Sequence, residues 1–292
     1  MAGRDRISEL PFDIINKILG LLVIEEVAGM AVLSTFWRGI WLSFTHLNFD
    51  AMFLKHIEKK YSNAHSDIRT KNKKKEKRNN DIWTSAGLYV INKVLIQHNG
   101  FINKFVIDFS HTPRNTLRSR SFDFDQWLLF ITQKGIEEIS LSLKREDGYC
   151  LPNCIFSCPS LRRLHICGVS FKPINAHCTL PNVTSLYFED VNFDGGGLLV
   201  DVPTLNSLSF IRCDNVTGFN ITAQKLDHLA IIDGPLYSIN LDLTYCRCLE
   251  LDSSSLEDFV NEFTRKRELQ LQLYALNVQH LKISTNEEYL KS

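Results

Sequence analysis

The sequence predicts a mixed α/β protein in which a short helical segment is followed by an irregular solenoid of repeats with one parallel β-sheet. Three observations support this fold class. Apolar residues recur at helical spacing up to about residue 46, and a proline-led apolar template recurs roughly every 22 residues from about residue 100. A connector with a dense run of charge separates the two patterns.

The composition excludes several classes of protein. The 292 residues are 44% hydrophobic and 23% charged, and 33 basic side chains balance 33 acidic ones. A chain of this length can bury a sizeable core, and its even charge argues against a strongly basic nucleic-acid binder. No apolar run is typical of a signal peptide or membrane span, so we expect neither. For a chain that stays inside the cell, the eight cysteines should be mostly reduced.

Residues 1–46 predict three short helices. Pro11 suits a first helical position because it lacks an N–H group, and Asp13 favours the positive end of a helix. One apolar stripe follows at steps of three and four residues: Ile14, Ile15, Ile18, Leu19 and Leu22. Helices of this length cannot bury so many large side chains by themselves, and we expect them to need a partner surface.

This segment resembles the F-box. The anchors that carry the resemblance are Leu10-Pro11, Ile18-Leu19, Leu22, Val32-Leu33-Ser34, Trp37-Arg38 and Trp41. The resemblance implies docking on the Skp-type adaptor of an SCF (cullin-RING) ubiquitin ligase. By the same resemblance, the first part of the interface would be Leu10, Pro11, Ile14, Ile15, Ile18 and Leu19. Leu33, Ser34, Trp37 and Trp41 would support the later helices or touch the adaptor, with plain core packing the alternative for each apolar side chain.

Residues 47–100 form the predicted connector. Within it we expect an exposed, mobile loop at 69–80, because Arg69 to Arg78 holds seven basic residues and one acidic residue. Such a run can serve as a nuclear-import signal or simply as solvated surface. Nucleic-acid binding is the weaker interpretation, because no aromatic side chain in the run could stack on bases.

From residue 101 to 292 the sequence predicts irregular leucine-rich repeats. Three copies of the template Pro-x-apolar-x-x-Leu-x-apolar begin at Pro159, Pro181 and Pro203. Looser copies, numbered from their first apolar residue, are Ile102, Ile136, Leu226, Cys246 and Val278. Numbered in the same way, the spacings between residues 136 and 246 are 25, 22, 22, 21 and 20. This period is typical of leucine-rich repeats, whose short strands stack into a parallel sheet.

The template also predicts which side chains face inward. Its last two apolar positions lie two residues apart on a strand and should be buried, while the residues beside them line the concave face. The Asn or Cys expected at the ninth position is present only as Cys213, so we expect turns packed by apolar side chains. Target specificity would reside in the variable strand positions Arg162, Arg163, Tyr187, Ser209 and Ala230.

No motif indicates catalysis, a metal or a cofactor. Cys150, Cys154 and Cys158 recur every four residues, but structural zinc sites use closer pairs, so buried or half-buried repeat cysteines are the preferred interpretation. Residues 195–197 are three glycines without the lysine of a phosphate-binding loop. His165 and His228 fall on variable strand positions, where each is either a ligand contact or an ordinary surface histidine.

Together, the F-box-like segment and the repeats resemble the plant F-box/LRR family, whose members often end in an FBD domain. The resemblance covers about residues 5 to 255, and residues 262–292 do not match the FBD pattern. It implies a non-catalytic substrate receptor of an SCF ligase, in the nucleus or cytoplasm, that binds an unknown target protein. Two alternatives stay open: a repeat scaffold outside any ligase, and a nucleic-acid-associated protein acting through the basic loop.

Overall fold

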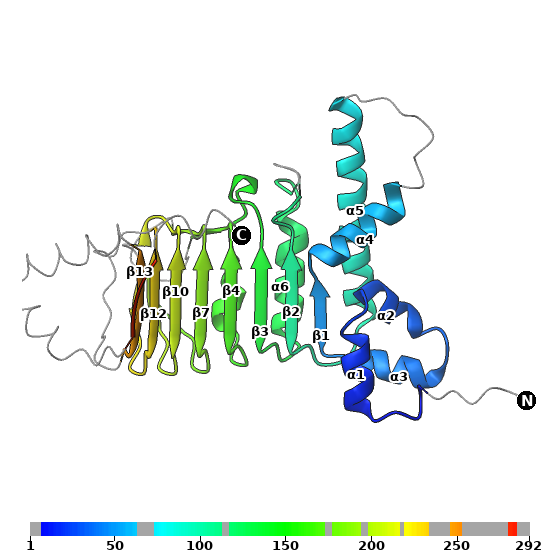
Figure 1. The fold of residues 1–292 in the computed structure, drawn as a ribbon, viewed down its shortest axis with the longest axis horizontal. Helices are drawn as coiled ribbons and strands as arrows, with labels where there is room; N and C mark the ends of the chain where they lie inside the picture. The colour runs from blue at the N-terminus through cyan, green and yellow to red at the C-terminus, as the bar shows by residue number, and fades with distance from the viewer. Residues whose placement is uncertain are drawn as a thin grey trace, which may run out of the picture. The chain divides into compact units, whose positions relative to one another are not determined.

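A computed structural model of the chain describes residues 7–62, 73–112, 117–172, 177–193, 198–216, 219–233, 246–252 and 280–284. The chain divides into two compact units, Met1–Ile136 and Glu137–Ser292. Figure 1 labels the main helices and strands of both units. The mixed α/β fold class, with N-terminal helices followed by a parallel solenoid sheet, is confirmed.

The first unit is mainly helical. Its elements are α1 (Phe12–Leu19), α2 (Ile24–Met30), α3 (Thr35–Ser43), β1 (His46–Phe49), α4 (Ala51–Ser62), α5 (Lys73–Gln97), β2 (Lys104–Asp108) and α6 (Ser121–Thr132). Strands β1 and β2 pair in parallel, with Leu47 opposite Phe105. The three predicted N-terminal helices are therefore present.

Local signals explain where these helices begin and end. Pro11 lies just before α1, and its carbonyl oxygen accepts hydrogen bonds from the backbone amides of Ile14 and Ile15 at 3.0 and 3.1 Å. The proline thus caps the helix, one residue earlier than predicted. Helix α3 begins after Ser34, whose hydroxyl oxygen accepts a hydrogen bond from the backbone amide of Trp37 at 3.3 Å. Such a cap satisfies one of the free amides at a helix start.

The connector supplies part of the partner surface that the short helices need. Helix α2 contacts both α5 and β1. The ring of Trp41 meets His98, just after α5, edge-on at 5.3 Å between ring centroids. A carboxylate oxygen of Asp50 caps α4 by accepting from the amides of Met52 and Phe53 at 2.9 and 3.1 Å. The N-terminal helices are thereby joined to the rest of the first unit.

Helix α5 differs from the predicted connector. It begins at Lys73, so residues 73–80, expected in an exposed loop, are helical, whereas residues 69–72 lie outside the described part of the chain. Lysine, arginine and glutamate are good helix formers, so a charged run that lacks proline and glycine can continue a helix. The import signal expected in this run stays a prediction.

The second unit contains the repeats. Its main strands are β3 (Glu138–Ser142), β4 (Arg163–Cys167), β7 (Ser185–Glu189), β10 (Ser207–Ile211), β12 (His228–Ile232), β13 (Cys248–Asp252) and β14 (His280–Ser284). These strands follow one another in chain order, and each pairs in parallel with the next. Figure 1 shows β3 through β13 side by side. They coincide with the strict and looser template copies.

The repeat strands bury the side chains that the template predicts. In β3, β4 and β7 buried residues alternate with partly exposed ones. Phenylalanine rings fill the space behind the strands, with Phe188 and Phe210 stacked at 5.6 Å between ring centroids. At the ninth template position Val169 and Val191 are each 1% exposed, which agrees with apolar turns. Cys213 is also buried there, and its thiol donates to the backbone oxygens of Phe188 and Ile211 at 3.4 Å each.

Short return segments complete the repeats. Two short 3-10 helices, η2 (Arg145–Asp147) and η3 (Asn153–Ser157), follow β3. Strands β5 (Ser170–Phe171) and β8 (Asn192–Phe193) form one small parallel sheet, and β6 (His177–Thr179), β9 (Leu198–Asp201) and β11 (Phe219–Thr222) form another. These segments were not predicted from the sequence. Runs of two to four residues are too short to show a period of two.

A left-handed backbone turn follows each of four successive repeat strands. The residues with positive φ are Gly168, Asp190, Arg212 and Asp233, with φ of 71°, 51°, 50° and 50°. The amides of Gly168, Asp190 and Arg212 donate to the last carbonyl oxygen of the following strand at 2.8 to 2.9 Å. The amide of Asp233 donates instead to a carboxylate oxygen of Asp252 at 2.9 Å. This series, which we call the turn ladder, joins consecutive repeats.

Candidate interaction surfaces

The N-terminal helices carry an exposed apolar surface. The sequence-predicted contact residues that are exposed are Leu10, Pro11, Ile14, Ile18, Leu33 and Ser34. Leu33 is 67% exposed, and the neighbouring Val32 is 83% exposed. Monomeric proteins rarely expose large contiguous apolar areas, so a cluster of such side chains is typical of a binding surface.

The other predicted contact residues lie in the core. Ile15, Leu19, Trp37 and Trp41 are between 2% and 7% exposed. Ile15 and Leu19, predicted to supply the first part of the interface, are one helical turn apart on the inward face of α1, whereas Ile14 and Ile18 occupy its outward face. For Trp37 and Trp41 the supporting role is the one that this burial favours.

The apolar surface extends beyond the residues singled out from the sequence. Phe12 on α1, Leu21 after α1 and Phe36 on α3 are exposed, Leu21 to 88%. None belongs to the apolar stripe by which α1 was recognised. The sequence does carry one indication of this surface: α1 has more apolar residues than a single buried stripe accounts for. A helix that is apolar on two faces needs a packing partner on each face.

The strands of the second unit present a second candidate surface. One row of register partners runs across it: Ser140, His165, Tyr187, Ser209, Ala230 and Glu250. Of the predicted specificity positions, Arg162 and Arg163 are exposed and Tyr187 is half-buried, whereas Ser209 and Ala230 are buried. In this row Ser140, His165, Tyr187 and Glu250 are half-buried and stay partly accessible, and the two aromatic side chains among them lie on β4 and β7.

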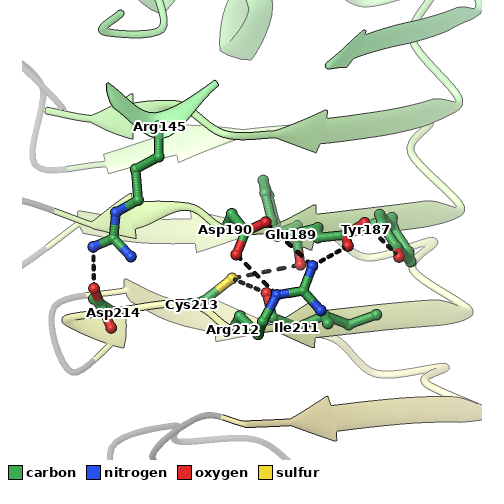
Figure 2. Close-up of polar contacts among 9 residues, drawn as sticks. Arg145, Tyr187, Glu189, Asp190, Ile211, Arg212, Cys213 and Asp214 are labelled. Carbon is green, nitrogen blue, oxygen red and sulfur yellow. Dashed lines mark hydrogen bonds and ion pairs between the residues drawn. The ribbon is translucent and has the colours of Figure 1, made fainter. Parts of the chain in front are cut away.

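A network of polar contacts lies beside Tyr187, as Figure 2 shows. The Tyr187 hydroxyl donates to a carboxylate oxygen of Glu189 at 3.0 Å. The guanidinium of Arg212 bridges Glu189 and Asp190, with Nε at 2.9 Å from an Asp190 oxygen. These carboxylates raise the pKa of the guanidinium, and burial together with Glu189 raises the pKa of the Tyr187 hydroxyl. Both groups hold their protons throughout the physiological range.

Comparison with known protein families shows which family the chain belongs to. A model described as "At1g61320/AtMIF1, LRR domain" matches residues 94–290, and a model of the F-box domain matches residues 7–48. The chain belongs to the F-box/LRR-repeat family. The F-box match covers the exposed apolar residues of α1 to α3, and the repeat match covers every described strand of the second unit. Neither match is to a family of enzymes.

Relatives of this F-box/LRR-repeat chain occur in Arabidopsis thaliana. It is 30% identical to "F-box/FBD/LRR-repeat protein At1g13570" over 243 residues, which are 82% of this chain and 51% of the relative. It is 29% identical to "F-box/LRR-repeat protein At3g59200" over 214 residues, 70% of this chain and 36% of the relative. The chain thus spans about half or less of these relatives' lengths. No solved structure matches it significantly.

The F-box is anchored to the first unit by a buried histidine. A ring nitrogen of His98 lies 2.7 Å from the carbonyl oxygen of Phe44, the residue that directly follows α3. His98 is only 1% exposed, and this burial lowers its pKa below the ordinary value for histidine. The neutral ring therefore donates to the end of α3, and the adjacent Trp41 ring shields the contact.

Cross-strand ion pairs join neighbouring LRR strands at their amino ends. Arg163 pairs with Glu138 across β3 and β4, with 2.6 Å between nitrogen and oxygen. Arg247 pairs with Asp227 one repeat apart at 2.5 Å. The arginine side chains are more than half exposed, so solvent screens the attraction within each pair and its contribution to stability is small. Their main effect is that they neutralise this edge of the sheet.

The cysteines at positions 150, 154 and 158, expected to be buried or half-buried, differ in exposure. Cys150 is exposed, which differs from its expected burial, while Cys154 is half-buried and Cys158 is buried. Among the described residues, one group could bring metal-ligating atoms together: Cys167, Glu189 and Asp190. The guanidinium of Arg212 already pairs with both carboxylates, and a metal cation would have to displace it.

No helix in the described ranges combines the length and the apolar character needed to cross a membrane. The longest described helix, α5, is 25 residues and begins with several charged side chains.

Proposed function

We propose that this chain is a substrate-receptor subunit of an SCF (cullin-RING) ubiquitin ligase, working in the nucleus or cytoplasm. Exposed apolar side chains of the F-box bind the Skp-type adaptor, and the strand face of the repeats binds a target protein. The chain itself is non-catalytic, because its part is to raise the effective concentration of target lysines near the ubiquitin-loaded enzyme.

The observation that carries this proposal is the division of F-box residues between core and surface. Ile15, Leu19, Trp37 and Trp41 already fill the interior of this segment. Ile14, Ile18 and Leu33 are left exposed, although burial of the apolar area that remains in water would stabilise each of them. An apolar surface of this kind on a segment that matches the F-box model is suited to a protein partner rather than to further folding.

Ser34 has a structural role within this surface. Its hydroxyl is occupied by the amide of Trp37 at the start of α3, and Leu33 projects from the turn just before it. The cap fixes the backbone at the point where Leu33 is presented. We therefore place Leu10, Pro11, Ile14, Ile18 and Leu33 in contact with the adaptor, and we assign the exposed Ser34 the role of a positioning residue.

Co-purification with the Skp-type adaptor tests the proposal. The double variant Ile14→Asp/Ile18→Asp places two charges on the exposed face of α1, so adaptor binding should fall at least about a hundredfold. The milder pair Leu10→Ala/Pro11→Ala should weaken it as well. Ile96→Asp is the matched control, because Ile96 is an exposed isoleucine on α5, outside the F-box surface.

Two results would contradict the proposal. One is a wild-type chain that does not bind the adaptor. The other is an Ile14→Asp/Ile18→Asp variant that binds as wild type does, with a circular dichroism spectrum showing that it is folded. Equal loss in the Ile96→Asp control would point to a general defect and would likewise remove the support for this surface.

A further inference from the structure

An aromatic pair stands on the strand face of the repeats. The rings of His165 on β4 and Tyr187 on β7 lie 4.2 Å apart between centroids, with their planes tilted by 39°. The two residues are register partners and both are half-buried. The next residues in their row are Ser140 and Ser209, whose side chains are too short to cover the rings. The pair is therefore the bulkiest feature of this row on β3 through β10.

The Tyr187 ring is held in place before any partner arrives. His165 packs against the ring, and the hydroxyl donates to Glu189. Glu189 is in turn fixed by Arg212, which also binds Asp190. Binding to such a ring loses little side-chain entropy, and rigid tyrosines are common anchors at protein interfaces.

The charged residues around the His165–Tyr187 pair determine which kind of side chain it can bind. Glu189 and Asp190 share the single guanidinium of Arg212, so this group keeps a net negative charge. On the other side of the pair, Arg163 is neutralised by Glu138. The Tyr187 hydroxyl also donates to an anion, which increases the electron density of the ring and its attraction for a cation.

We propose that the His165–Tyr187 pair is the docking point for the target protein, and that it takes an extended segment carrying a lysine or arginine. The cationic side chain lies against the exposed part of the Tyr187 ring, with its charge directed at the carboxylates of Glu189 and Asp190. This inference rests on the target-binding half of the proposed function and specifies the chemistry of the target.

Selection from a library of random nine-residue peptides tests this inference with the purified full chain. Wild type should enrich peptides with lysine or arginine at one fixed position. Tyr187→Ala should lose that preference and bind a selected peptide roughly tenfold more weakly. Tyr89→Ala is the matched control, because Tyr89 is an exposed tyrosine on α5, and it should behave as wild type.

Two further variants keep the test independent of folding. Tyr187→Phe retains the ring, so it should keep the preference for a cationic residue and lose only a fewfold in affinity. Glu189→Gln removes a charge, and it should weaken binding of the cationic peptide while abolishing part of its salt dependence. Enrichment of acidic peptides, no enrichment at all, or an unchanged preference in Tyr187→Ala overturns the inference. Adaptor binding is measured separately, so its failure would count against the ligase and leave this result standing.

Discussion

His98 shows how one side chain connects a motif to its scaffold. The helices of the F-box are short, and the last of them ends at a carbonyl oxygen that must be satisfied. The His98 ring supplies the donor to that oxygen, on Phe44, and packs edge-on against Trp41. The placement of the end of α3 therefore depends on a residue 54 positions after Phe44 in the sequence.

The burial of His98 predicts a pH dependence of stability. Its pKa is lower in the folded chain than the value of about 6.5 for an unfolded one, so protonation favours unfolding. The contribution of neutral His98 to the free energy of unfolding is fully present above about pH 6.5. Below that pH the free energy of unfolding falls, by at most about 1.4 kcal/mol per pH unit. Urea unfolding of the full chain at pH 7.5 and 5.5 measures this.

The variant His98→Gln provides the comparison. Glutamine keeps a donor but does not titrate, so the variant should be less stable at pH 7.5 and should lose less of its stability on acidification. If wild type and variant lose equal free energy between the two pH values, His98 is not the group responsible.

At the scale of elements, the repeats depend on the turn ladder. Gly168 shows the geometric requirement most directly, because a Cβ atom built there would lie 2.0 Å from the carbonyl oxygen of Leu143. Asp190 and Arg212 adopt the same left-handed turn with side chains attached. The close approach of a neighbouring backbone is what restricts the position in this repeat to glycine.

We predict that Gly168→Ala destabilises the chain by about 2 kcal/mol or more, because it adds a backbone clash to the cost of a left-handed conformation. Gly39→Ala is the control. Gly39 lies within α3, and an added methyl group there would meet nothing within 4 Å, so alanine should be neutral or stabilising by up to about 1 kcal/mol. Thermal unfolding of wild type and of both variants measures these differences in stability. Equal stability of Gly168→Ala and wild type would contradict the requirement.

The elements also show what could be predicted from the sequence. The strict copies at Pro159, Pro181 and Pro203 precede β4, β7 and β10, and the looser copies mark further strands, because a buried strand needs apolar residues two apart. Strand β1 was not predicted, because four residues are too few to show the alternation of buried and exposed side chains that is typical of a strand. For α1, the sequence shows apolar residues on two faces, and only packing reveals that Ile15 points inward and Ile14 outward.

At the scale of the whole molecule, the thiols should differ widely in reactivity. Burial raises the pKa of Cys213 to about 12, and its thiol donates to two backbone oxygens. Cys158 is buried as well, whereas Cys150 is exposed. Because the thiolate is the reactive form, access and pKa together should rank these residues.

We predict that iodoacetamide at pH 7.5 modifies Cys150 well before Cys158 and Cys213 in the native chain, as followed by peptide mass spectrometry. In denaturant the three should react at similar rates, which provides the internal control. Native labelling of Cys213 as fast as Cys150 would mean that the interior of the repeats is open to solvent.

The turn ladder has a consequence for how such a protein can diverge. The hydrogen bonds of the turn ladder are donated by main-chain amides. Substituting the side chains of Asp190 or Arg212 therefore leaves these hydrogen bonds between repeats in place. A repeat protein built in this way can change the side chains beside Tyr187 while keeping the hydrogen bonds between its repeats. We therefore expect relatives only 22% to 30% identical to this chain to keep the turn ladder while their side chains at these positions differ.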